Sequence, residues 1–329
     1  MSALSLEQVS ACSCGSRDLA PPTRTLRLGG DRFGLRRCRR CRRMLLDPRP
    51  RSEAIESCYD DDYYGAGERK FIPAIERVVD RFREGRARLA SRLLRDMGRE
   101  GKGRVLDIGC GSGQFLARLV RSGHECHGTE LSAETGRRAG LIPGLRLHTG
   151  ELERDRFPKG SFDLISIWHV LEHLPEPDRI LGFCHDWLSD GGALMVAVPN
   201  IDSLQATLFR GSWFHLDPPR HLHHFGRASL ERALSAAGFR IERVRTLSWE
   251  QNVYGVAQSA LNAMGFPRDE YYEVLKGNRS LWSSPRLALE LVLMAALLPL
   301  AFLFALLESS LGRGGTLECI ARRDGPGRA

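Results

Sequence analysis

The stretch that decides the fold is "RVLDIGCGSG", residues Arg104–Gly113. Its apolar first half predicts a short buried strand, and Gly109, Gly111 and Gly113 follow where a helix should begin. Glycine lets the backbone approach a ligand closely, and a helix N-terminus offers unpaired N–H groups just beyond the turn. An acid, Glu130, ends the next expected strand, where it can accept hydrogen bonds from both hydroxyls of a ribose. This order of elements predicts a site for a nucleotide-type cofactor.

Working outward from this stretch, short apolar runs alternate with helical patterns over most of the chain. We expect strands at 104–109, 124–130, 145–148, 162–169, 193–198, 239–247 and 316–323. An amphipathic helix is expected before them, because apolar residues recur at helical spacing from Ile75 to Met97. Strands separated by helices predict an α/β protein with a doubly wound, mostly parallel sheet covered on both faces.

Asp107, just before the first glycine, distinguishes two kinds of cofactor. A carboxylate there would repel the pyrophosphate of a dinucleotide, which disfavours an oxidoreductase, but it suits a cofactor that carries an ammonium group. With "DIGCGSG" as its first motif, the chain resembles the class I S-adenosylmethionine-dependent methyltransferases. The resemblance continues in "GELERDRFPKGSFDLISIWHVLEHLPEP", "GGALMVAVPN" and "HLHHFGRASLERALSAAGF", and it covers roughly residues 100–250 and the last strand. It implies a seven-stranded Rossmann-like sheet whose last strand is antiparallel, and methyl transfer from S-adenosylmethionine.

The resemblance also implies roles for individual residues in holding S-adenosylmethionine. Asp107 should bind the ammonium group, Gly109, Cys110 and Gly111 should line the amino-acid end, and Gly113 completes the turn. Glu130 should hold the ribose, with Leu131 against the adenine and Glu151 and Leu152 at its edge. Trp168 and His169 should close the pocket below the sulfonium, although Trp168 is equally compatible with a core position at a strand end.

Methyl transfer to oxygen or nitrogen benefits from a base, and histidine is suited to that task near neutral pH. Two loops at the expected ligand-binding edge of the sheet carry histidines. His169 and His173 follow the fourth expected strand, and His215, His221, His223 and His224 follow the fifth. We favour His221 as the base, with His173 and His169 as further candidates; His173 could instead pack at a helix start, and His223 and His224 could pack locally.

Four cysteines near the start of the chain predict a zinc site. Cys12 and Cys14 are separated from Cys38 and Cys41 by a short hairpin, a spacing that suits a tetrahedral site of four thiolates in a reducing cytoplasm. The alternative is four unligated thiols. Many methyltransferases of this kind carry such a zinc ribbon. We therefore expect a ribbon at 1–50, a linker and helix at 51–100, a methyltransferase core at 101–248, an insertion at 249–315 and the last strand and tail at 316–329.

The positive charge of the chain lies mostly in the ribbon. Of a net charge of +8, twelve arginines against three acids fall between Arg17 and Arg51. This surface could be ordinary solvated charge, or it could recognise an anionic headgroup or phosphate through the arginines of "RRCRRCRRM". This arginine-rich segment is the only feature that supports the alternative of an RNA or protein methyltransferase. We do not expect nucleic acid to be the partner. A cofactor-binding scaffold without activity is a third alternative.

The insertion contains "LVLMAALLPLAFLFALL", seventeen uncharged residues from Leu291 to Leu307. As a helix it would span about 25 Å, against about 30 Å of bilayer hydrocarbon, and Pro299 should kink or split it. A single crossing would separate the last two strands, which must pair. We therefore expect 287–307 to dip into one leaflet at the cytoplasmic face; the alternative is a lid or dimer face of a soluble protein. We therefore expect a membrane-associated enzyme that methylates a small-molecule or lipid-linked acceptor on oxygen or carbon. The sequence predicts no oligomeric state.

Overall fold

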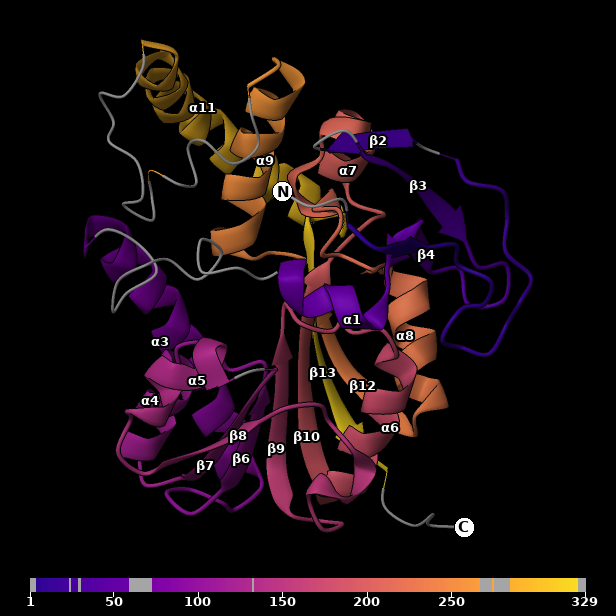
Figure 1. The fold of residues 1–329 in the computed structure, drawn as a ribbon. Helices are drawn as coiled ribbons and strands as arrows, with labels where there is room; N and C mark the ends of the chain where they lie inside the picture. Colours follow the sequence, from indigo (N-terminus) through magenta and orange to yellow (C-terminus); the bar gives the residue numbers. More distant parts are fainter. Residues whose placement is uncertain are drawn as a thin grey trace.

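The computed structural model describes residues 4–23, 25–28, 31–58, 73–131, 133–266, 274 and 285–324. A large sheet with helices on both sides forms the body of the molecule. A small sheet from the N-terminal segment lies at one upper corner, and two packed helices, α9 and α11, project from the top (Figure 1).

Seven strands form the large sheet. In spatial order they are β12 (Phe239–Arg245), β13 (Thr316–Arg323), β10 (Leu188–Pro199), β9 (Phe162–Trp168), β6 (Arg104–Ile108), β7 (Glu125–Glu130) and β8 (Leu145–Thr149). Only β13 runs antiparallel to its neighbours, β10 and β12. The predicted fold is confirmed. The fifth strand begins five residues earlier than expected, since Leu188 pairs with Phe162 and the register then shifts before Ala193.

Alternating side chains of the central strands face two apolar layers. Val105, Leu164 and Met195 pack with α3 (Pro73–Asp96) and α4 (Gln114–Arg121) on one face. Their neighbours Leu106 and Ile165 pack with α6 (Pro177–Trp187) and α8 (Arg227–Ala236) on the other face. α5 (Ala133–Gly140) contacts β7 and β8. Apolar packing therefore covers both faces of the sheet. A ligand can bind only at the edge of the sheet where β6, β7 and β9 end.

The N-terminal segment forms an antiparallel sheet that is completed by the core. Its strands are β2 (Thr25–Leu28), β3 (Asp31–Arg37) and β4 (Met44–Asp47), and the edge strand on the other side of β4 is β11 (His223–His224). In the same segment, β1 (Leu6–Glu7) pairs with β5 (Arg49–Pro50), which is followed by α1 (Ser52–Ile55) and η1 (Glu56–Cys58). Phe33, Leu35 and Leu46 pack against the loop that follows β10, at Trp213, Leu216 and Leu222.

The insertion between β12 and β13 contributes α9 (Trp249–Ala263) and α11 (Pro285–Ser310). They pack against each other and, through α9, against α7 (Leu204–Phe209), η3 (Arg210–Ser212) and η4 (Phe214–Leu216). Of the two expected effects of Pro299, the splitting of the helix is wrong, because α11 is one helix with Pro299 inside it. A proline removes only one helical hydrogen bond, and Met294 and Ala301 on either side of it are anchored in the apolar contact with α9.

One face of α11 is buried and the opposite face is exposed and apolar. The apolar residues of α11 exposed by 40% or more are Leu289, Val292, Leu298, Leu300, Phe302, Leu303, Leu306 and Leu307. The helix is long and apolar enough to cross a membrane by length and composition. An exposed apolar surface of this kind normally meets a lipid or a partner.

Candidate functional site

The glycine turn leaves β6 in left-handed backbone geometry. Gly109, Gly111 and Gly113 have φ of +69°, +55° and +69°, and the N–H groups of Gly109 and Cys110 both donate to the carbonyl of Thr129, at 3.0 Å. A Cβ added at Gly113 would lie 2.8 Å from Ile142, so this glycine is required for packing. A Cβ added at Gly111 would meet no atom of the described residues within 4 Å. The backbone at Gly111 is therefore open to a ligand.

Two buried carboxylates flank this turn. Asp107 lies near the end of β6 and accepts a hydrogen bond from the Ser166 hydroxyl on β9; burial raises its pKa to about 7 against the opposing charge of Arg86. Glu130 is the last residue of β7 and accepts a hydrogen bond from the N–H of Gly111. The two acids and the open glycine thus share one sheet edge, as predicted.

The remaining predicted cofactor residues surround this edge more loosely. Leu131 is 41% exposed, Glu151 is exposed, and Cys110 and Leu152 are half-buried. Trp168 is half-buried against the layer covered by α3, with the Arg86 guanidinium 4.9 Å from its ring centroid. Its indole Nε1 has no hydrogen-bond partner among the described residues. Arg86 also forms a 2.9 Å ion pair with Glu250 of α9, so it joins this wall of the site to the insertion.

The three predicted catalytic histidines gather around one glutamate, Glu172. His169, in left-handed geometry with φ of +55°, places Nδ1 3.4 Å from Glu172 Oε1. His173 and His221 contact each other edge to face, with ring centroids 4.6 Å apart. Burial lowers the pKa of all three rings to about 4, so they are neutral near pH 7. Two loops that are distant in sequence therefore meet in one buried cluster.

Hydrogen bonds fix the proton positions of two of these rings. His221 Nδ1 lies 2.8 Å from the carbonyl of His215, and His173 Nδ1 lies 3.1 Å from the carbonyl of Arg220. A carbonyl only accepts, so Nδ1 donates in both rings and Nε2 carries the lone pair. Glu172 and Asp217, which interact with these histidines, were not predicted from the sequence. Glu172 stands beside His173 in the quoted motif, and that adjacency was the available signal.

His223 and His224 make local contacts, the alternative considered for them. His223 and His224 form β11, and His223 Nε2 lies 3.2 Å from the carbonyl of Pro175. They pair with β4 and so hold the N-terminal sheet against the core. His215, also in this loop, is buried and accepts the His221 Nδ1–H through its backbone carbonyl.

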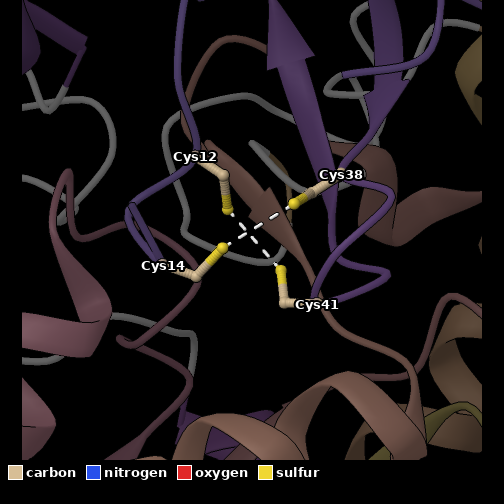
Figure 2. Close-up of side chains that lie close together, drawn as sticks. All are labelled: Cys12, Cys14, Cys38 and Cys41. Atoms are coloured by element: carbon tan, nitrogen blue, oxygen red, sulfur yellow. Dashed lines mark hydrogen bonds between the residues drawn. The ribbon is translucent and has the colours of Figure 1, made fainter. Parts of the chain in front are cut away.

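The four predicted zinc ligands converge, with their sulfur atoms directed at one another (Figure 2). The Sγ atoms of Cys12 and Cys41 are 3.6 Å apart, and those of Cys14 and Cys38 are 3.7 Å apart. Zinc–sulfur bonds of about 2.3 Å in a tetrahedron require sulfurs about 3.8 Å apart. The donor set therefore fits a structural zinc ion.

The arginines around this knuckle do not form one free surface, which corrects the hypothesis that all of them face a ligand. The Arg43 side chain is fully buried, with Nη1 and Nη2 2.7 and 2.9 Å from the carboxylate of Asp178 on α6 and its guanidinium 4.6 Å from the Phe225 ring centroid. Arg36 donates to the carbonyls of Ala20 and Val9. Arg39, Arg40 and Arg42 are exposed.

Comparison with known proteins agrees with this geometry. The sequence model of the methyltransferase domain matches residues 80–244. The ubiquinone biosynthesis O-methyltransferase of Chelativorans sp. (strain BNC1) is 32% identical over 148 residues, which are 41% of this chain and 58% of that protein. The enzyme of the same name from Psychrobacter cryohalolentis is 28% identical over 37% of this chain and 51% of that protein. The chain thus spans little more than half the length of these curated relatives.

Among solved structures, an S-adenosylmethionine-dependent methyltransferase from Mesorhizobium loti is 21% identical and covers 70% of this chain and 95% of that chain, with a TM-score of 0.42. A likeness this distant adds nothing to what the strand order already shows. The match to the methyltransferase domain spans half of the chain and includes the glycine turn, both acids and the histidine cluster. The chain therefore belongs to the class I S-adenosylmethionine-dependent methyltransferases.

Proposed function

We propose that this protein transfers the methyl group of S-adenosylmethionine to an oxygen, or alternatively a carbon, of a small amphiphilic or lipid-linked acceptor that it takes from a membrane surface. The observation that carries the acceptor class is the exposed apolar face of α11. The α9–α11 pair joins the core between the ends of β12 and β13, and Thr316 pairs with Pro199 at the end of β10. The α9–α11 pair therefore stands at the edge of the sheet where β9 and β10 end (Figure 1), which is also the edge of the cofactor turn after β6.

The cofactor residues take the roles that their positions allow. Asp107 would bind the ammonium of S-adenosylmethionine and Glu130 the ribose, with Gly109, Cys110, Gly111 and Gly113 forming the turn beneath. Leu131, Glu151 and Leu152 would border the adenine, and Trp168 would close the pocket. The open space over Gly111 and its left-handed geometry support this arrangement.

The reaction is an in-line displacement at the methyl carbon. The acceptor oxygen forms the new bond, the carbon–sulfur bond breaks with its electrons moving to sulfur, and the acceptor gives up its proton. Most of the rate acceleration comes from alignment of donor and acceptor. His169, His173 and His221 are the candidates for handling the proton. For His221 the lone pair lies on Nε2, 3.8 Å from Asp217 Oδ2 and within the cluster around Glu172.

The insertion would contact a membrane from one side of the bilayer and would not cross it. β12 and β13 are adjacent antiparallel strands, so the insertion leaves and re-enters the sheet on the same side. α9 buries polar residues (Asn252, Gln258 and Ser259), which does not suit a bilayer span. We propose that α11 lies in the interface of the cytoplasmic face with its exposed apolar side in lipid. The names of the relatives, ubiquinone biosynthesis O-methyltransferases, are consistent with methylation of a small molecule at oxygen.

The N-terminal segment would serve as a zinc-stabilised cover rather than as a reader of nucleic acid. Its sheet packs on the loop that follows β10, and two of its arginines are engaged inside the protein. We propose that Cys12, Cys14, Cys38 and Cys41 bind one structural zinc ion.

The test is to incubate the purified protein with methyl-labelled S-adenosylmethionine and the separated lipid, RNA and protein fractions of the source cell. We expect label in the organic-extractable fraction and none with the Glu130→Ala variant. Glu134→Ala, an exposed acid on α5, is the matched control and should retain activity. Label confined to RNA or protein would overturn the proposed acceptor class, and no label in any fraction would support a scaffold without activity.

A further inference from the structure

We propose that Glu172, His173 and His221 form a binding site for a divalent transition-metal ion, separate from the four-cysteine cluster. Each residue offers one ligand atom, and these atoms all lie within 4.8 Å of one another. A carboxylate oxygen and two imidazole nitrogens are donors that zinc and other first-row divalent metals prefer. Magnesium and calcium, which prefer oxygen ligands only, are disfavoured.

The two imidazoles are oriented as metal-binding imidazoles usually are. In each, the Nδ1–H is held by a backbone carbonyl, at 2.8 Å for His221 and 3.1 Å for His173. This contact fixes the tautomer and directs the Nε2 lone pair, which is the role of the outer hydrogen bonds around known metal sites. The lone pairs are therefore set by the fold before any ion binds.

The backbone holds the carboxylate close to the second loop. The N–H groups of Leu222 and His223 both donate to the carbonyl of Glu172, at 3.0 Å each. His173 follows Glu172 in the first loop, and His221 precedes Leu222 in the second. This backbone contact therefore brings the two histidines close together from different loops. An ion here would join the loop after β9 to the loop after β10, the two loops that border the proposed acceptor site.

The charge balance of the cluster also favours a cation. Glu172 is 1% exposed, and neither carboxylate oxygen accepts a hydrogen bond from the residues that the structure describes. Its nearest basic neighbour, His169 Nδ1, lies 3.4 Å away outside hydrogen-bond geometry. A buried carboxylate without partners is costly unless it is neutralised or binds a metal. The nearby Arg220 is bound to Asp217 by two contacts of 2.6 and 2.9 Å.

Three protein ligands are the number found in catalytic zinc sites, which keep a further position for water or substrate. This part of the inference rests on the proposed function. An acceptor hydroxyl bound to the ion would have a lowered pKa, so its proton would pass to solvent as its oxygen attacks the methyl carbon and the sulfonium becomes a neutral thioether. The ion would then replace His221 as the group that activates the acceptor.

The test is to strip the full-length protein of metal with a chelator and titrate it with Co²⁺. The wild type should bind two ions per chain, and only the one bound by cysteine should give a sulfur-to-cobalt charge-transfer band. Glu172→Gln and His221→Gln should each bind one ion and keep that band. A Cys38→Ser/Cys41→Ser variant should bind one ion and lose the charge-transfer band.

His185→Gln, a half-buried histidine on α6, is the matched control and should still bind two ions. One ion per chain in the wild type, accompanied by the charge-transfer band, would overturn the inference whether or not the variants fold. So would two ions in folded Glu172→Gln and His221→Gln. The stoichiometry does not depend on turnover, so a failure of the proposed methyl transfer would be seen separately in the labelling assay.

Discussion

Asp107 makes cofactor binding depend on pH in a defined direction. Burial raises its pKa from 3.8 to about 7, so the folded protein favours the protonated acid and, without ligand, loses stability as the pH rises between these values. An ammonium ligand requires the ionised form. Affinity for S-adenosylhomocysteine, which keeps the ammonium, should therefore rise about tenfold from pH 5.5 to 6.5 and level off near pH 7. Calorimetric titration checks this, and Asp107→Asn should bind weakly with a flat profile. A flat wild-type profile would show that Asp107 is not the ammonium partner.

The two glycines at the turn should separate cofactor binding from folding. Both require left-handed geometry, which costs an alanine about 1–2 kcal/mol. Gly113→Ala would in addition overlap Ile142, Ala139 and Leu145, so it should lower the free energy of unfolding by the larger amount. Gly111→Ala meets no described protein atom and should instead lose at least about tenfold in cofactor affinity, because the added methyl fills the space of the ligand. Equal effects of both variants on stability and on affinity would contradict this assignment.

At the scale of elements, the contact between Arg43 and α6 should be a main attachment of the N-terminal sheet. Arg43→Ala leaves Asp178 without its bidentate partner and removes the guanidinium from Phe225, at a cost of about 3 kcal/mol. The thermal unfolding midpoint should fall by roughly 5 °C or more. Arg40→Ala, an exposed arginine of the same run, should leave it unchanged. If both variants unfold at the wild-type temperature, the attachment depends on apolar packing alone.

The exposed face of α11 should carry membrane binding. Val292 and Leu303 are 64% and 62% exposed, so replacing both with Glu should change the fold little while making insertion into hydrocarbon costly. In flotation with vesicles, we expect the wild type to rise with lipid and Val292→Glu/Leu303→Glu to remain in the dense fraction. Leu141→Glu, which alters a residue 78% exposed outside the insertion, should float like the wild type. A wild type that does not float, or that forms a stable dimer lost in the double variant, would favour a dimer face.

For the molecule as a whole, the sequence predicted what local pattern determines. The strand order, the turn with Asp107 and Glu130, and the convergence of four cysteines all follow from spacing within short segments or from the family resemblance. The Arg43–Asp178 pair and the Glu172 cluster were not predicted, because each joins loops whose relative position depends on how whole layers pack. The continuous helix through Pro299 was also missed, since support from α9 outweighs the loss of one hydrogen bond.

The strand β11 ties the order of synthesis to the order of folding. Leu45 of β4 pairs with His223, a residue made 178 positions later, so the N-terminal sheet cannot gain its last strand until most of the chain has left the ribosome. At about 5–20 residues per second, this delay is about 10–35 s. During that time β4 has an open edge, and the same N-terminal segment carries the four free thiols of Cys12, Cys14, Cys38 and Cys41. Early capture of an ion by the cysteines would protect the nascent segment, so metal supply during translation should influence the yield of folded protein.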